Sequence, residues 1–120
     1  MKILICEDEQ DIAEVMSRIL ADNGHETMVS DNCLTIEEKI KKYDPDIVMM
    51  DIWLPGFDGK KIIRRIKSAD KENNLPVIII SAATDIAEVA NAAGADAYLT
   101  KPFDLNNLLA LVKKYETIKN

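Results

Sequence analysis

Short apolar runs alternate with amphipathic stretches along the whole chain. Four consecutive apolar residues occur at positions 3–6, 47–50 and 77–80, and a fourth run at 95–99 is interrupted by Asp96. Unbroken runs of this length, rich in β-branched side chains, are typical of strands in a parallel sheet that is covered on both faces. The half-polar segment His25–Ser30 predicts a further strand at the edge of the sheet.

The stretches between these runs have the periodicity of helices. Positions 12, 15, 16, 19 and 20 are apolar and fall on one helical face, which Gly24 ends. Thr84 and Asp104 are expected to be the N-caps of the last two helices, and Asp44 with Pro45 should end the second. Helices are accordingly also predicted at 33–43, 59–69, 85–93 and 105–115.

The fold class follows from the strict alternation of five predicted strands and five predicted helices. Parallel strands need crossover connections, so this order predicts a doubly wound α/β domain with a five-stranded parallel sheet and helices on both faces. A chain of 120 residues has the length of one domain, and we expect a single domain over residues 1–120.

The chain is acidic, with 21 Asp and Glu residues against 15 Lys and Arg residues and a formal charge of −6. A nucleic-acid-binding protein needs basic patches, so this balance argues against DNA or RNA as the direct ligand. It favours a bound cation or a positively charged partner, although solubility alone also explains it. The longest apolar run is 108–112, and the first run is too short for a signal peptide, so we expect a cytoplasmic protein without membrane insertion.

The two cysteines, Cys6 and Cys33, carry no motif. Their spacing fits neither a metal site nor a disulfide framework. Cys6 ends an apolar run and is expected to be a small buried residue.

Polar side chains follow four of the predicted strands at the point where each strand ends. They are Glu7 and Asp8, Asp51, Ser81 and Lys101. In open α/β sheets ligands bind beyond the carboxyl ends of the strands, so these side chains should converge at one edge. Each taken alone has an ordinary structural explanation, such as a helix cap, a backbone hydrogen bond or a solvated lysine. Together they indicate a site, because polar groups follow every strand that could line it.

The chemistry of this group of residues is consistent with phosphoryl transfer. Glu7, Asp8 and Asp51 would repel one another without a cation, and hard carboxylate oxygens suit Mg²⁺. Lys101 can hold a phosphate oxygen, Ser81 can donate a hydrogen bond to another, and a carboxylate can serve as the nucleophile that becomes an aspartyl-phosphate.

These motifs resemble the receiver domain of bacterial two-component response regulators, in the form of a single-domain, chemotaxis-type receiver. Positions 3–9, 51–59, 81–82 and 92–103 carry the likeness, and Asp8, Asp51, Ser81 and Lys101 follow one another at intervals of 43, 30 and 20 residues. The resemblance implies a flavodoxin-like strand order, 2-1-3-4-5. It also implies a signalling phosphoacceptor rather than an enzyme, one that assists its own phosphorylation and dephosphorylation.

The resemblance also implies roles for individual residues. Asp51 would accept the phosphoryl group from a phosphohistidine on a sensor histidine kinase or a histidine phosphotransfer protein. Asp8, Asp51 and the backbone carbonyl of Trp53 would bind Mg²⁺ (or Mn²⁺) directly, while Glu7 would act through water. Lys101 would contact the phosphoryl group.

Activation, by the same resemblance, would move Ser81 toward the phosphoryl group and Tyr98 inward. A half-buried edge tyrosine is the alternative interpretation of Tyr98. The surface that changes, and that binds an unknown downstream protein, would be formed by the helix at 85–93, the strand at 95–99 and the helix at 105–115. The peptide between Lys101 and Pro102 would be cis.

Several positions depart from the common pattern or bear on the alternatives. Glu7 replaces the commoner aspartate, and its extra methylene could bring it directly to the metal. Trp53 could shield an acyl phosphate from water and Ala83 cannot orient one, which suggests a long-lived phosphorylated form; a partner contact explains Trp53 equally well. A flavin-binding protein would need a loop rich in Gly, Ser or Thr after the first strand, and a haloacid-dehalogenase-like phosphatase would carry an acid where Trp53 stands.

Overall fold

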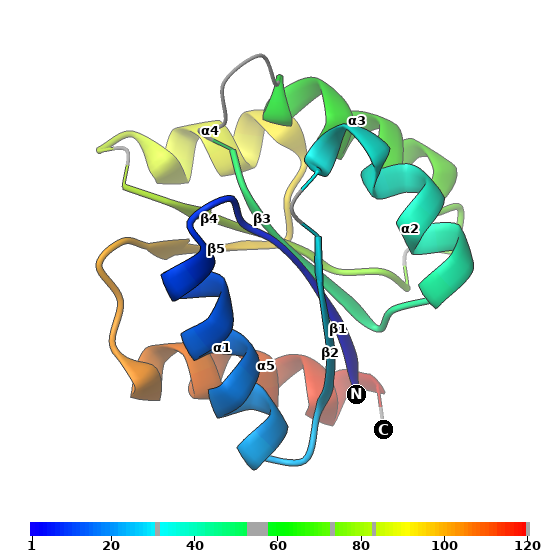
Figure 1. Ribbon diagram of the computed structural model, residues 1–120. Helices are drawn as coiled ribbons and strands as arrows, with labels where there is room; N and C mark the ends of the chain where they lie inside the picture. Colours follow the sequence, from blue (N-terminus) through cyan, green and yellow to red (C-terminus); the bar gives the residue numbers. More distant parts are fainter. Residues whose placement is uncertain (31, 53–57, 73, 83, 120) are drawn as a thin grey trace.

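The sheet has five parallel strands in the order β2-β1-β3-β4-β5 (Figure 1). The computed structural model describes residues 1–30, 32–52, 58–72, 74–82 and 84–119, with side chains as far as residue 116. This topology confirms the predicted fold class and strand order. The strands are β1 (Lys2–Cys6), β2 (Glu26–Ser30), β3 (Ile47–Asp51), β4 (Val77–Ser81) and β5 (Ala97–Thr100).

Helices cover both faces of the sheet (Figure 1). One face packs against α1 and α5, and the other against α2, α3 and α4. None of the helices in the described ranges is long and apolar enough to cross a membrane. The helices are α1 (Gln10–Asp22), α2 (Ile36–Tyr43), α3 (Gly59–Ala69), α4 (Ile86–Ala93) and α5 (Leu105–Lys119), with a short 3₁₀ helix, η1 (Cys33–Thr35), before α2.

The two apolar cores follow from the alternation of side chains along the strands. Ile3 and Ile5 of β1 face the α1 and α5 side, whereas Leu4 and Cys6 face the α2, α3 and α4 side. Because both faces are buried, the inner strands β1, β3 and β4 read as continuous apolar runs. The edge strand β2 is half exposed, as its mixed sequence predicts.

Several boundaries differ from the predicted ones. The helix predicted at 33–43 begins as η1, because the Asn32 side chain accepts a hydrogen bond from the Leu34 N–H and so fixes a tight first turn. Thr84 is not the cap of α4; Asp85 occupies that position without a side-chain cap. Asp104 does cap α5, since its Oδ1 accepts from the Asn107 N–H at 2.8 Å.

The start of β5 also lies later than the apolar run suggests. Asp96 ends the turn that follows α4, and its carboxylate accepts hydrogen bonds from the Val77 N–H at 2.8 Å and from the Lys67 Nζ at 2.9 Å. These contacts fix Asp96 outside the strand, so the strand begins at Ala97. The interruption of this run by a charged residue therefore has a structural cause.

The two cysteines, whose spacing indicates no disulfide framework, nevertheless meet in the fold. Cys6 at the end of β1 lies against Cys33 at the start of η1, with their Cα atoms 5.9 Å apart. The expectation that Cys6 is buried is confirmed.

The single histidine, His25, is buried where α1 leads into β2. Its Nδ1 accepts a hydrogen bond from the N-terminal amine at 3.2 Å, and its Nε2 lies 3.6 Å from a carboxylate oxygen of Glu116 on α5. Burial and the nearby ammonium lower the pKa of His25 below 6.5, and Glu116 only partly opposes this shift.

We therefore expect the contribution of His25 to the stability of the protein to fall as the pH drops below about 6.5. The unfolded chain binds the histidine proton more readily than the folded one, so acid favours unfolding, whereas the stability from neutral His25 is fully present above that pH. Urea unfolding midpoints between pH 5 and 7.5 should fall more steeply with acid in the wild type than in His25→Gln. Parallel pH profiles for the two proteins would contradict this assignment.

Candidate metal and phosphoryl site

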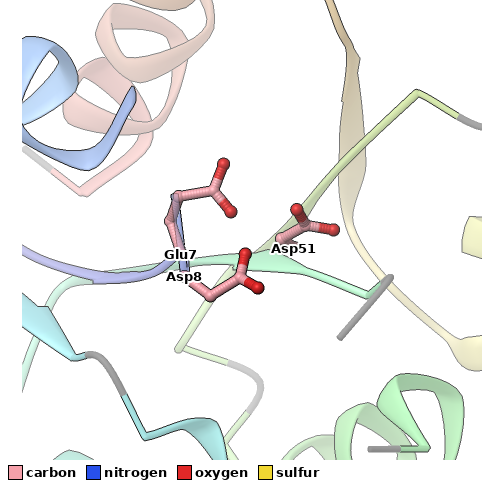
Figure 2. Close-up of side chains that lie close together, drawn as sticks. All are labelled: Glu7, Asp8 and Asp51. Carbon is pink, nitrogen blue, oxygen red and sulfur yellow. The ribbon is translucent and has the colours of Figure 1, made fainter. Parts of the chain in front are cut away.

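Three carboxylates meet at the carboxyl edge of the central strands (Figure 2). β1 pairs with β3 in a register that aligns Cys6 with Met50, so the residues that follow, Glu7 and Asp51, lie side by side. One carboxylate oxygen from each of Glu7, Asp8 and Asp51 lies within 4.8 Å of the others. The sequence-based prediction that these side chains converge is therefore confirmed.

The cluster has the properties of a site for a hard divalent cation. Glu7 and Asp51 are buried and Asp8 is exposed, which leaves one side open to solvent. The Oε2 of Glu7 is buried without a hydrogen-bond partner among the described residues, and such an orphaned oxygen is costly unless something compensates it. Because Mg²⁺ takes oxygen ligands, keeps several waters and needs only one or two carboxylates, these residues fit that ion.

Lys101 neutralises part of this negative charge from the far side of the site. Its Nζ donates to the Oδ2 of Asp51 at 2.8 Å and also to the Oε1 of Glu7. The Lys101 side chain is only 12% exposed, so both ion pairs are largely shielded from water. Its backbone N–H donates to the Ser81 carbonyl at 2.8 Å, which ties the residue after β5 to the end of β4. The Lys101–Pro102 peptide is cis, as expected.

The direct contact between Glu7 and Lys101 was not predicted. Glu7 was expected to reach the cation through water, and in the structure it is a direct partner of the lysine. The extra methylene of glutamate, relative to aspartate, is the one signal in the sequence that could have indicated this longer reach.

Burial and the neighbouring charges shift the pKa values of Glu7 and Lys101. Burial raises the pKa of Glu7 to about 7; Asp51 adds to the shift and the hydrogen bond from Lys101 opposes it. Burial lowers the pKa of Lys101, but its hydrogen bonds to Asp51 and Glu7 outweigh that effect and raise the pKa overall. Lys101 therefore stays charged at neutral pH, whereas the Glu7 carboxyl is only partly ionised there.

The structure also places Ser81 and Tyr98, two further residues that were predicted to belong to the site. Ser81 is fully buried as the last residue of β4, the strand next to the one that carries Asp51. Tyr98 is 45% exposed on the edge strand β5, opposite Ile79 of β4 and thus before the end of the sheet. Trp53 and Ala83 lie outside the described residues.

An apolar groove beside Lys101 was missed by the sequence analysis. It has a volume of about 520 Å³ and lies between α1 and the segment that joins β5 to α5. Val15 and Leu105 on its walls are half exposed, although residues of this type are usually buried. The helical periodicity around Val15 indicates only a core face, so the groove could not be predicted from the sequence.

We expect Lys101→Ala to destabilise the metal-free protein by about 3 kcal/mol, because two buried carboxylates lose their counter-ion. Mg²⁺ should restore part of the loss, since a bound cation supplies the missing positive charge. Urea unfolding at pH 8 in a chelator and then in excess Mg²⁺ measures both effects. The matched control is Lys60→Ala, an exposed lysine of α3, which should change stability by less than about 0.5 kcal/mol. Equal losses in the two variants would contradict the role given to Lys101.

Comparison with known proteins places the chain in one family. It matches the response regulator receiver domain over residues 3–113. It is 33% identical to sporulation initiation phosphotransferase F of Bacillus subtilis, across 99% of this chain and 96% of that protein. It is 32% identical to the response regulator MprA of Mycobacterium leprae, across 94% of this chain, but spans only 50% of that relative's length.

A solved structure agrees with this match. The crystal structure of a two-component response regulator from Clostridium difficile superposes with a TM-score of 0.88 at 25% identity, covering 100% of this chain and 98% of that one. The chain belongs to the receiver domains of response regulators, the phosphoacceptor domains of two-component signalling.

Proposed function

We propose that Asp51 is the phosphoacceptor of this receiver domain and that the domain occupies residues 1–120. The observation that carries the assignment is the position of Asp51: it ends a central strand, contacts Lys101 at 2.8 Å and faces the carboxylates of Glu7 and Asp8. Among the three acids, Asp51 alone contacts the lysine while ending a strand between two other strands. A nucleophile needs this fixed, partly shielded position.

The phosphoryl group would come from a phosphohistidine on a sensor histidine kinase or a histidine phosphotransfer protein. A carboxylate oxygen of Asp51 attacks phosphorus, the bond between phosphorus and the imidazole nitrogen breaks, and the imidazole leaves with the electron pair. Lys101 stays within reach of a phosphoryl oxygen and compensates the added negative charge.

Receiver domains bind Mg²⁺ at an acidic pocket, and we assign that role here to Glu7, Asp8, Asp51 and the backbone carbonyl of Trp53. A bound Mg²⁺ (or Mn²⁺) would reduce the repulsion between these carboxylates and the incoming phosphoryl group. The exposed carboxylate of Asp8 and the buried Oε2 of Glu7, which has no hydrogen-bond partner among the described residues, offer oxygen ligands for such an ion. The Trp53 carbonyl is carried over from the resemblance alone.

The groove beside Lys101 is the surface that we assign to the phosphohistidine-bearing partner. It is mostly apolar, opens next to the lysine and lies against α1, so a helix seated there would present its histidine to Asp51. Glu9 and Asp11 stand at its rim and would favour a partner with positive charge around the apolar contact.

Phosphorylation would act as a switch on α4, β5 and α5. The added group carries a charge of roughly −1.5 to −2, so it favours an arrangement in which the Ser81 hydroxyl and Lys101 both bind it. Ser81 and Thr100 are register partners, which couples the end of β4 to β5 and hence to Tyr98. The half-exposed Tyr98 would then move inward, and the surface it leaves would contact the downstream protein.

Two finer features belong to the same proposal. The domain would assist its own dephosphorylation, because the groups that stabilise transfer to Asp51 also stabilise transfer from it to water. A cytoplasmic location, where sensor kinases use ATP, fits the acidic composition.

Incubation with Mg²⁺ and acetyl phosphate should add one phosphoryl group to the intact chain, and Asp51→Asn should abolish this addition. Asp8→Asn should slow the addition and demand more Mg²⁺, while Asp22→Asn, an exposed acid at the end of α1, should behave like the wild type. Intact-mass spectrometry follows the product over time. Full phosphorylation of Asp51→Asn would contradict the assignment of Asp51 as the phosphoacceptor.

Ser81→Ala should still accept the phosphoryl group but should fail to transmit the change to Tyr98. The hydroxyl is the group that pulls the end of β4 toward the phosphoryl oxygen, and alanine keeps the packing while removing that bond. Fluorotyrosine NMR in the presence of Mg²⁺ and phosphodonor should show a shifted Tyr98 resonance in the wild type and an unshifted one in the variant. A shift of equal size in both would refute this route of coupling.

A further inference from the structure

The two cysteines of the chain meet although 27 residues separate them in sequence. Cys6 is the last residue of β1, Cys33 is the first residue of η1, and their Cα atoms lie 5.9 Å apart, within the range that a disulfide spans. The sequence holds no other cysteine, so within one chain this is the sole pairing available. Their meeting is independent of the phosphoacceptor chemistry.

The turn that presents Cys33 is shaped by polar contacts that involve no sulfur. The Asn32 side chain accepts from the Leu34 N–H at 3.1 Å. The Asn32 carbonyl accepts from the hydroxyls of Ser30 and Thr35, each at 3.1 Å. These bonds keep Cys33 facing the end of β1 whether or not the sulfur atoms are joined.

The surrounding core also suits both states of the pair. Cys6 and Cys33 belong to the apolar cluster between the sheet and α2, α3 and α4. A protonated thiol behaves as a small apolar group, so reduction leaves neither a buried charge nor a polar group without a partner. The fold can therefore hold two thiols or one disulfide in the same place.

The two cysteine residues differ in exposure and in the elements that hold them. Cys6 is fully buried in β1, which has a hydrogen-bonded neighbour on each side. Cys33 is 5% exposed and is the first residue of the short helix η1. The residue that follows it in η1, Leu34, is 69% exposed. Opening this turn exposes Cys33 without breaking the sheet, so exchange with a small molecule should begin there.

We propose that Cys6 and Cys33 are a reversible thiol–disulfide pair that exchanges with small disulfides such as glutathione disulfide. The Cys33 thiolate attacks the small disulfide, forms a mixed disulfide and releases the first small thiolate. The Cys6 thiolate then attacks the Cys33 sulfur and releases the second. The two cysteines lose two electrons, the small disulfide gains them, and the two cysteine protons end on the two small thiols.

The oxidised pair ties η1 and the start of α2 to the strand that ends beside Glu7. In the reduced protein the same turn is held only by its hydrogen bonds and by packing. Oxidation should therefore slow the local opening of residues 33–43 much more than it affects the rest of the molecule. The redox state of the pair thus sets the mobility of this part of the surface.

The experiment treats the full chain with glutathione disulfide or with dithiothreitol and then measures three quantities. The oxidised monomer should be lighter by two hydrogen atoms and take up no maleimide in urea, whereas the reduced one should take up two. Amide exchange over residues 33–43 should be more than about tenfold slower in the oxidised protein. Dithiothreitol added to the oxidised protein should restore both reduced-state readings.

Two variants act as controls. Cys33→Ser should exchange at the reduced-state rate under both treatments, which separates the bond from any other effect of the oxidant. Asp51→Asn should form the pair like the wild type, so failure of the phosphoacceptor assignment leaves this test intact. Two maleimides per chain after oxidation, disulfide-linked dimers as the main product, or equal exchange of residues 33–43 in both states would overturn the proposal.

Discussion

The position of Lys101 between two buried carboxylates is the constraint on which the site depends. Asp51 ends β3 and Glu7 directly follows β1, in the middle of the sheet, where burial would make their charges costly without a counter-ion. Lys101 follows β5, so its side chain must extend past the end of β4 to reach Asp51 on β3. That strand ends in Ser81, whose small side chain leaves room for this passage.

Much of this arrangement could be predicted from the chain, because strands covered on both faces have a strong sequence signal. The apolar runs located β1, β3 and β4, and the polar residues after them indicated the site. Details set by side-chain length and local turns could not be predicted. The contact of Glu7 with Lys101 depends on one methylene, and the start of η1 depends on the hydrogen bonds that Asn32 accepts from Leu34 and Thr35.

The pairing of Cys6 with Cys33 could not be predicted from the sequence, for a different reason. Spacing along the chain carries no information about two residues that meet through a strand, a helix and a turn. Their approach follows from the register of β1 with β2, which aligns Cys6 with Ser30, and from the turn that brings the chain back three residues later. It could be inferred only after the sheet order and that turn were known.

Cys6 and Glu7 are neighbours in the chain but serve opposite sides of the sheet. Cys6 packs into the core with α2, α3 and α4, while Glu7 turns toward the acidic edge and the α1 side. The sulfur pair and the Glu7 side chain therefore face different sides of the sheet, and the backbone of β1 connects them. β1 is held by strands on both sides. Reduction of the cysteine pair should therefore loosen η1 and α2 while leaving the carboxylates in place. The fold thus separates control of the α2 surface from phosphoryl chemistry at Asp51, whose own effects travel through β4 and β5.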